Sequence, residues 1–151
     1  MDNQLTRNFS LDEFACKCGC GIEDHYVHKL KTLALTFQLL RNEINIDPTL
    51  QVYKDRAHHK EFRLIPTSVI RCEKHNRDEG GKKKSYHLRA EAGDITCPGL
   101  PTSILYEKAK TFFPGCCWYK GRHFVHCDVR PITWHNIKEP SPELEEEVQV
   151  A

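Results

Sequence analysis

The chain has 151 residues, of which 39% are hydrophobic, and its formal net charge is +1. This length fits one domain with a single modest core and leaves little room for a second domain. No apolar run approaches the roughly 18 residues that a membrane span needs. Residues 1–6 contain neither a basic segment nor an apolar one. We therefore expect no membrane-spanning helix and no signal peptide.

The charge is unevenly distributed along the chain. Residues 139–151 carry five Glu and neither Lys nor Arg, so the rest of the chain has a net charge of +6. We expect one folded domain over residues 1–138 and an acidic, disordered tail over residues 139–151. A basic domain suits an anionic polymer such as nucleic acid or bacterial cell wall. A solvated surface with a disordered tail explains the same charges more simply.

Three segments near the N-terminus have clear local patterns. Residues 9–14 predict a short helical turn in which Ser10 and Glu13 have the spacing of a capping box. Residues 16–21 predict a tight loop of Cys and Gly. A long amphipathic helix is predicted from His28 to Ile44, because apolar residues recur there at steps of three and four. The apolar stripe of this helix consists of Leu30, Leu33, Phe37, Leu40 and Ile44.

The remaining segments alternate between short strands and polar or helical stretches. Strands are predicted at residues 50–53, 68–71, 94–96 and 124–130. Residues 54–66 and 76–84 are polar and predict a loop and a turn region. A second helix is predicted from Thr102 or Ser103 to about Phe113. Together these elements predict an α+β fold, with a small antiparallel sheet and flanking helices.

Eight Cys and nine His make metal binding the first chemistry to consider. Without a signal peptide, reduced thiols or metal ligands are more typical than a disulfide framework. Cys16, Cys18 and Cys20 are spaced too tightly for a CxxC zinc knuckle. A metal site formed with His25 is one interpretation of this loop, and a structural or redox role is the favoured one. A cysteine protease is a weak alternative, because no Cys stands in a recognisable nucleophile motif.

A second candidate metal site combines His87, Asp94 and His126. His87 and Asp94 are seven residues apart, and His126 lies on a later predicted strand. Catalytic zinc takes three protein ligands, often N or O donors, and keeps one position open for water. Spacing alone is weak support, because a chain with nine His offers such triples by chance.

Ordered motifs around these three residues strengthen the metal hypothesis. A strand ending in Arg is followed by His-Asn, a Gly-Gly turn, Ser-x-His, Asp and a late His-x-Asp. The motifs are Ser68–Cys72, His75-Asn76, Gly80-Gly81, Ser85-Tyr86-His87, Asp94-Ile95, Phe124–Arg130 and Trp134. This order resembles the zinc D-alanyl-D-alanine carboxypeptidases and related phage endolysins, especially their short single-domain branch. The opening residues 9–20 also look like that branch, so the resemblance covers about residues 9–134.

The resemblance implies a fold, a cofactor and residue roles. It implies a hedgehog/D-Ala-D-Ala peptidase-like zinc-peptidase fold with Zn²⁺ held by His87, Asp94 and His126. Arg71 would steer or polarise the substrate, and Ser85 would bind a substrate carboxylate or support the ligand loop. The expected reaction is hydrolysis of a peptide bond by water activated on zinc. The chain departs from the family where Ala90 replaces the usual Gly, and where Val-Ile replaces the usual Gly-Tyr before Arg71.

The general base is predicted from position alone. Relatives commonly place an acid or a His shortly before the last zinc ligand, and His123 lies three residues before His126. On a straight strand these two side chains would face opposite sides, so His123 needs a bulge or the start of the strand to reach the site. Asp128 shares the face of His126 and is predicted to orient that ligand.

The main functional hypothesis is therefore a monomeric zinc peptidase acting on peptidoglycan stem peptides, as carboxypeptidase or endopeptidase. It would be synthesised in the cytoplasm and act on the wall after release, during host-cell lysis or from a virion. One alternative is a non-catalytic wall-binding or virion structural module that keeps the zinc fold. Another is a Cys/His zinc module that binds nucleic acid with a steep salt dependence. It leaves the ordered motifs unexplained, so we expect no nucleic-acid partner.

Overall fold

The computed structural model describes residues 3–140, and its centre is a five-stranded sheet with the strand order β1-β2-β4-β3-β5. The strands are β1 Ile65–Ser68, β2 Ala92–Thr96, β3 Gly115–Tyr119, β4 Val125–Asp128 and β5 Trp134–Lys138. β1, β2, β4 and β3 pair antiparallel in that order, whereas β5 pairs parallel with β3. The α+β class is thus confirmed. The sheet is mixed rather than wholly antiparallel, because the chain passes from β4 to the outer side of β3.

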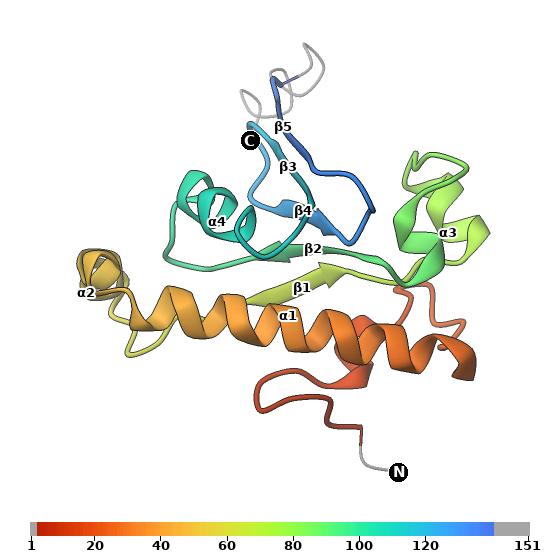
Figure 1. Cartoon of the computed structure of the whole chain (residues 1–151), viewed down its shortest axis with the longest axis horizontal. Coiled ribbons are helices and arrows are strands. Elements are labelled where there is room, and N and C mark those ends of the chain that lie inside the picture. The colour runs from red at the N-terminus through yellow and green to blue at the C-terminus, as the bar shows by residue number, and fades with distance from the viewer. Residues whose placement is uncertain (1–2, 141–151) are drawn as a thin grey trace.

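The helices are α1 Val27–Ile46, α2 Gln51–Ala57, α3 Glu73–Asp78 and α4 Thr102–Ala109. Four single turns of 3-10 helix join them: η1 Leu11–Phe14, η2 Asp24–Tyr26, η3 Pro48–Leu50 and η4 Tyr86–Arg89. Figure 1 shows α1 running along β1 and β2, with α2 and α3 towards opposite ends of the molecule. None of the helices in residues 3–140 is long and apolar enough to cross a membrane.

The core lies between α1 and one face of the sheet. The predicted stripe of α1 is buried, and the ring of Phe37 packs against the rings of Phe9, Phe14 and Phe113. A Cβ atom at Gly93 on β2 would lie 2.7 Å from the Phe37 ring. Only glycine therefore lets α1 approach β2 this closely. Asp94, the next residue, points to the opposite face of the sheet.

Several local predictions are confirmed. The capping box of Ser10 and Glu13 starts η1, with the Ser10 amide donating to Glu13 Oε2 over 2.7 Å. The long helix is α1, and it extends the predicted range by one residue at its start and two at its end. The strands predicted at 94–96 and 124–130 correspond to β2 and β4. The second helix begins at Thr102 as predicted but ends at Ala109.

Other local predictions are wrong. Residues 50–53 are helical, because Asp47 Oδ1 accepts from the Thr49 amide over 2.9 Å and starts η3, which leads into α2. Leu50-Gln51-Val52-Tyr53 is too short a segment for periodicity to separate a helix from a strand. The strand expected at 68–71 is β1 at 65–68, where Pro66 is tolerated at the edge of the sheet. The predicted tail lies outside the described residues from 141 onward.

Candidate metal centre

Three ligand side chains meet on the face of the sheet that α1 does not cover. Asp94 on β2 and His126 on β4 are direct cross-strand partners, and their side chains therefore share one face. η4 brings His87 to the same place. One potential ligand atom from each of the three residues lies within 4.8 Å of the others. The structure thus brings together the predicted metal ligands from three separate elements.

The turn between η4 and β2 places Asp94 opposite His126. Ala90 follows η4 with φ of +55°, in the left-handed region that residues with a Cβ rarely adopt. Its amide donates to the Tyr86 carbonyl and closes the turn. This conformation explains why a Gly at this position suits the turn. Ala90 keeps the same turn at the cost of local strain, so the ligand geometry survives the departure from the family pattern.

His87 has a fixed tautomer. Its Nδ1 lies 2.6 Å from the carbonyl oxygen of Val69, and a carbonyl only accepts, so Nδ1 carries the proton. The other ring nitrogen, Nε2, faces Asp94 Oδ1 at 3.3 Å. The His87 side chain is 3% exposed, so water does not compete for this arrangement. His87 therefore offers Nε2 as a metal ligand, and a backbone group defines its orientation.

His126 is fixed from behind by a carboxylate. Its Nε2 lies 2.7 Å from Asp128 Oδ2, and its Nδ1 lies 3.1 Å from Asp94 Oδ1. Arg130 holds Asp128 in turn, with Nε donating to Oδ1 over 2.8 Å and Nη2 donating to Oδ2 over 2.6 Å. The result is a chain of charges from Arg130 through Asp128 to His126, which leaves His126 Nδ1 for the metal. Sequence reasoning assigned no role to Arg130, although its alternation with Asp128 and His126 along the strand was visible.

The spacing of the donor atoms fits a tetrahedral ion. Ligand atoms about 2.0–2.1 Å from zinc lie roughly 3.3 Å from one another in a tetrahedron. Asp94 Oδ1 lies 3.3 Å from His87 Nε2 and 3.1 Å from His126 Nδ1. Two imidazole nitrogens and one carboxylate oxygen are also a typical donor set for catalytic zinc. His87, Asp94 and His126 therefore fit the group that the resemblance implies.

The charges in this cluster are strongly coupled. Burial by itself raises the pKa of the Asp94 carboxyl, but hydrogen bonds from His126 and His87 outweigh it and hold that pKa well below its usual range. Burial lowers the pKa of His126, but the carboxylates of Asp128 and Asp94 outweigh this and raise it to about 9. The carboxylates of Asp94 and Asp128 therefore favour positive charge at His126. The cluster is thus built to hold positive charge.

A cavity of about 730 Å³ opens over the three ligands. Seven of its described lining residues are Lys or Arg and two are carboxylates, so the cavity is suited to an anionic substrate. Arg71 lies beside the ligands, where Nη2 donates to Asp94 Oδ2 over 3.1 Å and Nε donates to Ser68 Oγ over 2.9 Å. Tyr119 and Trp134 form aromatic walls. The arrangement can place an extended, negatively charged ligand against a metal ion.

Comparison with known protein families agrees with this geometry. The sequence matches the Peptidase M15 family over residues 7–128, which is most of the chain. The chain belongs to the Peptidase M15 family. Searches of curated proteins and of solved structures gave no match. M15 peptidases are metal-dependent hydrolases, so the His/Asp cluster at the floor of the cavity is the candidate active site of a metallopeptidase.

Ser85 and His123, which also have predicted roles in this M15 peptidase, differ in their position relative to the cavity. Ser85 lines the cavity, and its Oγ accepts from the His87 amide over 3.2 Å, so it supports the ligand turn η4. His123 is exposed on the turn between β3 and β4, and the described residues lining the cavity do not include it. β4 starts only at Val125, so the strand geometry does not extend back to His123. Its role as general base stays a prediction.

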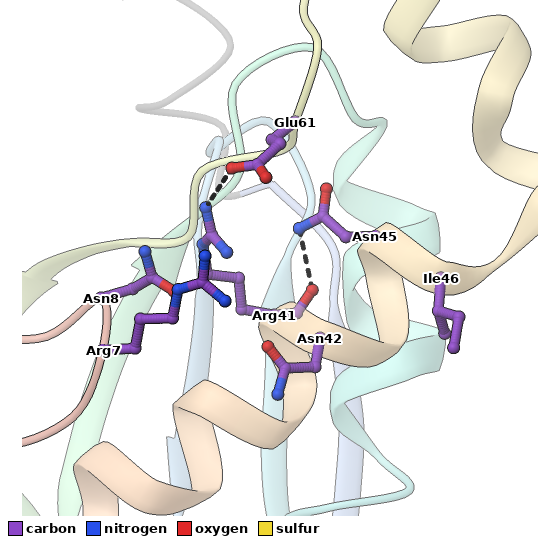
Figure 2. A pocket seen from close by; sticks show the side chains of 7 residues that line it. All are labelled: Arg7, Asn8, Arg41, Asn42, Asn45, Ile46 and Glu61. Atoms are coloured by element: carbon purple, nitrogen blue, oxygen red, sulfur yellow. Dashed lines mark hydrogen bonds and ion pairs between the residues drawn. The ribbon is translucent and has the colours of Figure 1, made fainter.

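A smaller hollow of about 350 Å³ lies near the C-terminal half of α1, away from the metal ligands. Figure 2 shows Arg7 and Asn8 meeting Arg41, Asn42 and Asn45 of α1 there. Arg41 already donates to Glu61 over 3.0 Å. No His or Cys is among the described residues that line this hollow. The chemistry of an M15 peptidase therefore belongs to the larger cavity.

Proposed function

We propose that this protein is a zinc-dependent peptidase that hydrolyses peptide bonds in the stem peptides of bacterial peptidoglycan. The observation that carries the proposal is the cluster of His87, Asp94 and His126 at the floor of a basic cavity. Stem peptides are rich in carboxylates, including the one at their C-terminus, and an excess of Lys and Arg is suited to bind them. Zinc is proposed because the donor set is two His and one Asp with tetrahedral spacing.

Each nearby residue has a role that its contacts support. A zinc ion held by these ligands would activate water and polarise the scissile carbonyl. Arg71 reaches the ligands from the cavity wall, so it can orient a substrate carboxylate or carbonyl beside the metal. Asp128 is fully buried, and both of its oxygens are occupied by Arg130 and His126. We therefore assign Asp128 to the orientation of His126 and not to proton transfer.

The substrate bond and the setting are part of the same proposal. Hydrolysis of a terminal D-alanyl-D-alanine bond would use the basic cavity to hold the terminal carboxylate. An endopeptidase would use it for the side carboxylates of the stem. We propose that the protein reaches the wall after release from the cytoplasm, as a phage or prophage lysis enzyme or as a virion component.

Mass spectrometry of muropeptides tests the proposal. Purified peptidoglycan is treated with the zinc-loaded protein, the metal-stripped protein, the stripped protein after zinc is restored, and His87→Ala. His28→Ala is the matched control, because His28 is exposed on α1 and is not among the described cavity residues. We expect new peptide ends with the loaded protein and His28→Ala only, and again after zinc is restored. The fragment masses identify the bond.

The same experiment separates the peptidase from its main rival. A non-catalytic wall-binding module would bind zinc and sediment with peptidoglycan but produce no new ends. The absence of new ends on walls of several bacterial types, with a full complement of zinc bound, would overturn the proposed activity. Ends that persist equally in His87→Ala would overturn the assigned metal centre.

A further inference from the structure

A second cluster of metal-type ligands lies outside the His/Asp centre. The sulfurs of Cys16, Cys18, Cys20 and Cys72 all lie within 4.8 Å of one another. Three of these residues come from the loop after η1, and Cys72 immediately precedes α3, more than fifty residues later in the chain. Sequence reasoning considered His25 as the partner of the loop. The structure instead supplies a fourth thiol, Cys72.

We propose that Cys16, Cys18, Cys20 and Cys72 bind a second metal ion, a zinc ion in a closed four-thiolate site. Zinc–sulfur bonds of about 2.3 Å in a tetrahedron require sulfur–sulfur distances of roughly 3.8 Å. Cys16 and Cys18 sulfurs are 3.2 Å apart, and Cys18 and Cys72 sulfurs are 3.6 Å apart. These distances exceed the bond of about 2.05 Å that joins a disulfide, and all eight cysteines of the chain are free thiols. Small shifts of the four sulfur atoms, some apart and some together, would accommodate the ion.

The backbone of the loop is shaped to bring alternate side chains together. Cysteines two residues apart on an extended strand would lie too far apart to share one ion. Here the Gly19 amide donates to the Cys16 carbonyl over 3.1 Å and closes a turn. Gly19 and Gly21 have φ of +81° and +85°, and nothing lies within 4 Å of a Cβ at either position. Glycine is therefore required there for the backbone conformation and not for space.

Hydrogen-bond donors already point at the sulfurs. The Cys72 amide donates to Cys16 Sγ over 3.5 Å, and the His75 amide donates to Cys72 Sγ over 3.4 Å. His75 Nδ1 lies 3.1 Å from Cys16 Sγ. Donors of this kind stabilise the thiolate form that a metal needs. They also fix the ligands from behind, as outer contacts do in established metal sites.

The number of convergent sulfurs favours a metal over a redox disulfide. A disulfide would join two of the four thiols and leave two without a role. Cys18 contacts both Cys16 and Cys72, so no single pair is separated from the others. Cys97, Cys116, Cys117 and Cys127 are buried elsewhere and belong to neither ligand group found in residues 3–140. Four thiolates fill a tetrahedron, so this ion would have a structural role and no open position for a substrate.

The position of the cluster gives the ion a consequence for the active site. Lys17, between two of the thiols, and His75, which contacts Cys16, both line the cavity over the His/Asp centre. Cys72 follows Arg71 directly, and the Arg71 amide donates to the His87 carbonyl over 3.1 Å. The ion would therefore tie the loop after η1 to the start of α3 and hold one wall of the cavity. The effect on the cavity rests on the proposed function, whereas the second metal site itself does not.

Metal analysis of the full-length protein tests the second site. The protein is purified without oxygen or chelators, and zinc is measured per chain. We expect two zinc ions per chain, one in His87→Ala, and one in Cys18→Ser or Cys20→Ser. Cys97→Ala is the matched control, since it removes a thiol outside the cluster, and it should keep both ions. A mercurial thiol reagent should release one zinc from His87→Ala.

Cobalt substitution tests the donor type through its absorption spectrum, first in a variant that keeps all four cysteines of the cluster. Cobalt-loaded His87→Ala should show strong thiolate-to-cobalt charge-transfer absorption in the near ultraviolet, and Cys18→Ser should lose most of it. This measurement keeps the proposal testable if a Cys variant fails to fold. His87→Ala that binds neither zinc nor cobalt would overturn the second site, as would a thiol count showing disulfides in the anaerobic protein. Wall hydrolysis is not measured here, so failure of the peptidase proposal would leave this test intact.

Discussion

The two ligand clusters of this chain are built in opposite ways. His126 and Asp94 stand on neighbouring strands in register, and His87 is fixed by a backbone carbonyl. Strand pairing and backbone hydrogen bonds therefore determine that geometry before any ion binds. The thiols Cys18 and Cys20 are exposed and lie on a loop. The sulfurs of that loop contact the start of α3, with Cys18 Sγ 3.6 Å from Cys72 Sγ and Cys16 Sγ 3.1 Å from His75 Nδ1.

The His/Asp cluster therefore has the character of a preorganised reactive centre, and the four-thiol cluster that of a cross-link. A centre with N and O donors and three protein ligands leaves a side open to the cavity, so its ion can take part in a reaction. Four thiolates enclose their ion and mainly contribute folding energy. We therefore expect changes at the first cluster to act on catalysis, and changes at the second to act on stability and on the cavity wall.

The largest effect is expected from Asp94→Asn. The amide keeps the shape of the carboxyl but removes the charge that both His ligands contact. Wall hydrolysis should fall by about 10³-fold or more, because a metal ion supplies several kcal/mol of transition-state stabilisation and about 1.4 kcal/mol is tenfold in rate. Zinc content should fall by one ion per chain. A variant that retains wild-type hydrolysis would place the reactive ion somewhere else.

A smaller loss is expected from Asp128→Asn. The variant keeps all three ligands but weakens the hydrogen bond that orients His126. Loss of such a contact typically costs about 10–100-fold in metal affinity or activity. Zinc titration and hydrolysis rates measure the change, with Val129→Ala as a neighbouring exposed control. Gly115→Ala should reproduce the defect, because a Cβ there would press against the Asp128 carboxylate. Unchanged zinc affinity in both variants would show that Asp128 does not orient the ligand.

Cys72→Ser should affect stability more than the chemical step. Loss of the cross-link should lower the melting temperature, where about 1 kcal/mol corresponds to 2–4 °C in a domain of this size. The loop after η1 should become more susceptible to proteases, and KM should rise while kcat changes little. Differential scanning fluorimetry, limited proteolysis and steady-state kinetics measure these effects, with Cys97→Ala as control. A fall in kcat equal to that of Asp94→Asn, with the melting temperature unchanged, would break the division between the two clusters.

The sequence predicted the parts of this molecule that local patterns specify. The stripe from Leu30 to Ile44 has the period of a helix and becomes the buried face of α1. The ordered motifs around His87, Asp94 and His126 identified residues that the structure brings together. β3 was missed because Gly115–Tyr119 is a continuous run without alternation. β5 was missed because its half-exposed, mixed composition resembles a loop.

Long-range contacts explain the remaining differences. No local signal indicates that Cys72, rather than His25, joins the loop thiols. That contact depends on the chain after η1 lying beside residues 70–72, where the Ile70 amide donates to the Phe14 carbonyl over 3.3 Å. The position of His123 has a related explanation. Alternation predicts a side only within a strand, and β4 begins after that residue.

The smallest effect is expected at an ion pair outside both clusters, which provides a baseline for the others. Lys108 Nζ donates to Asp47 Oδ2 over 2.6 Å, and this hydrogen bond, aided by those from Thr49, lowers the pKa of Asp47 from 3.8 to about 2. A carboxylate whose folded-state pKa is lowered stabilises the fold above its unfolded pKa, and this contribution is lost as the pH falls towards 2. Lys108→Met should therefore unfold at a slightly lower urea concentration than the wild type at neutral pH. The gap between the two urea midpoints should close on acidification. Because the pair touches neither cluster, zinc content and hydrolysis should stay unchanged. A gap that persists at acid pH would mean that the Lys108 side chain acts through packing and not through its charge.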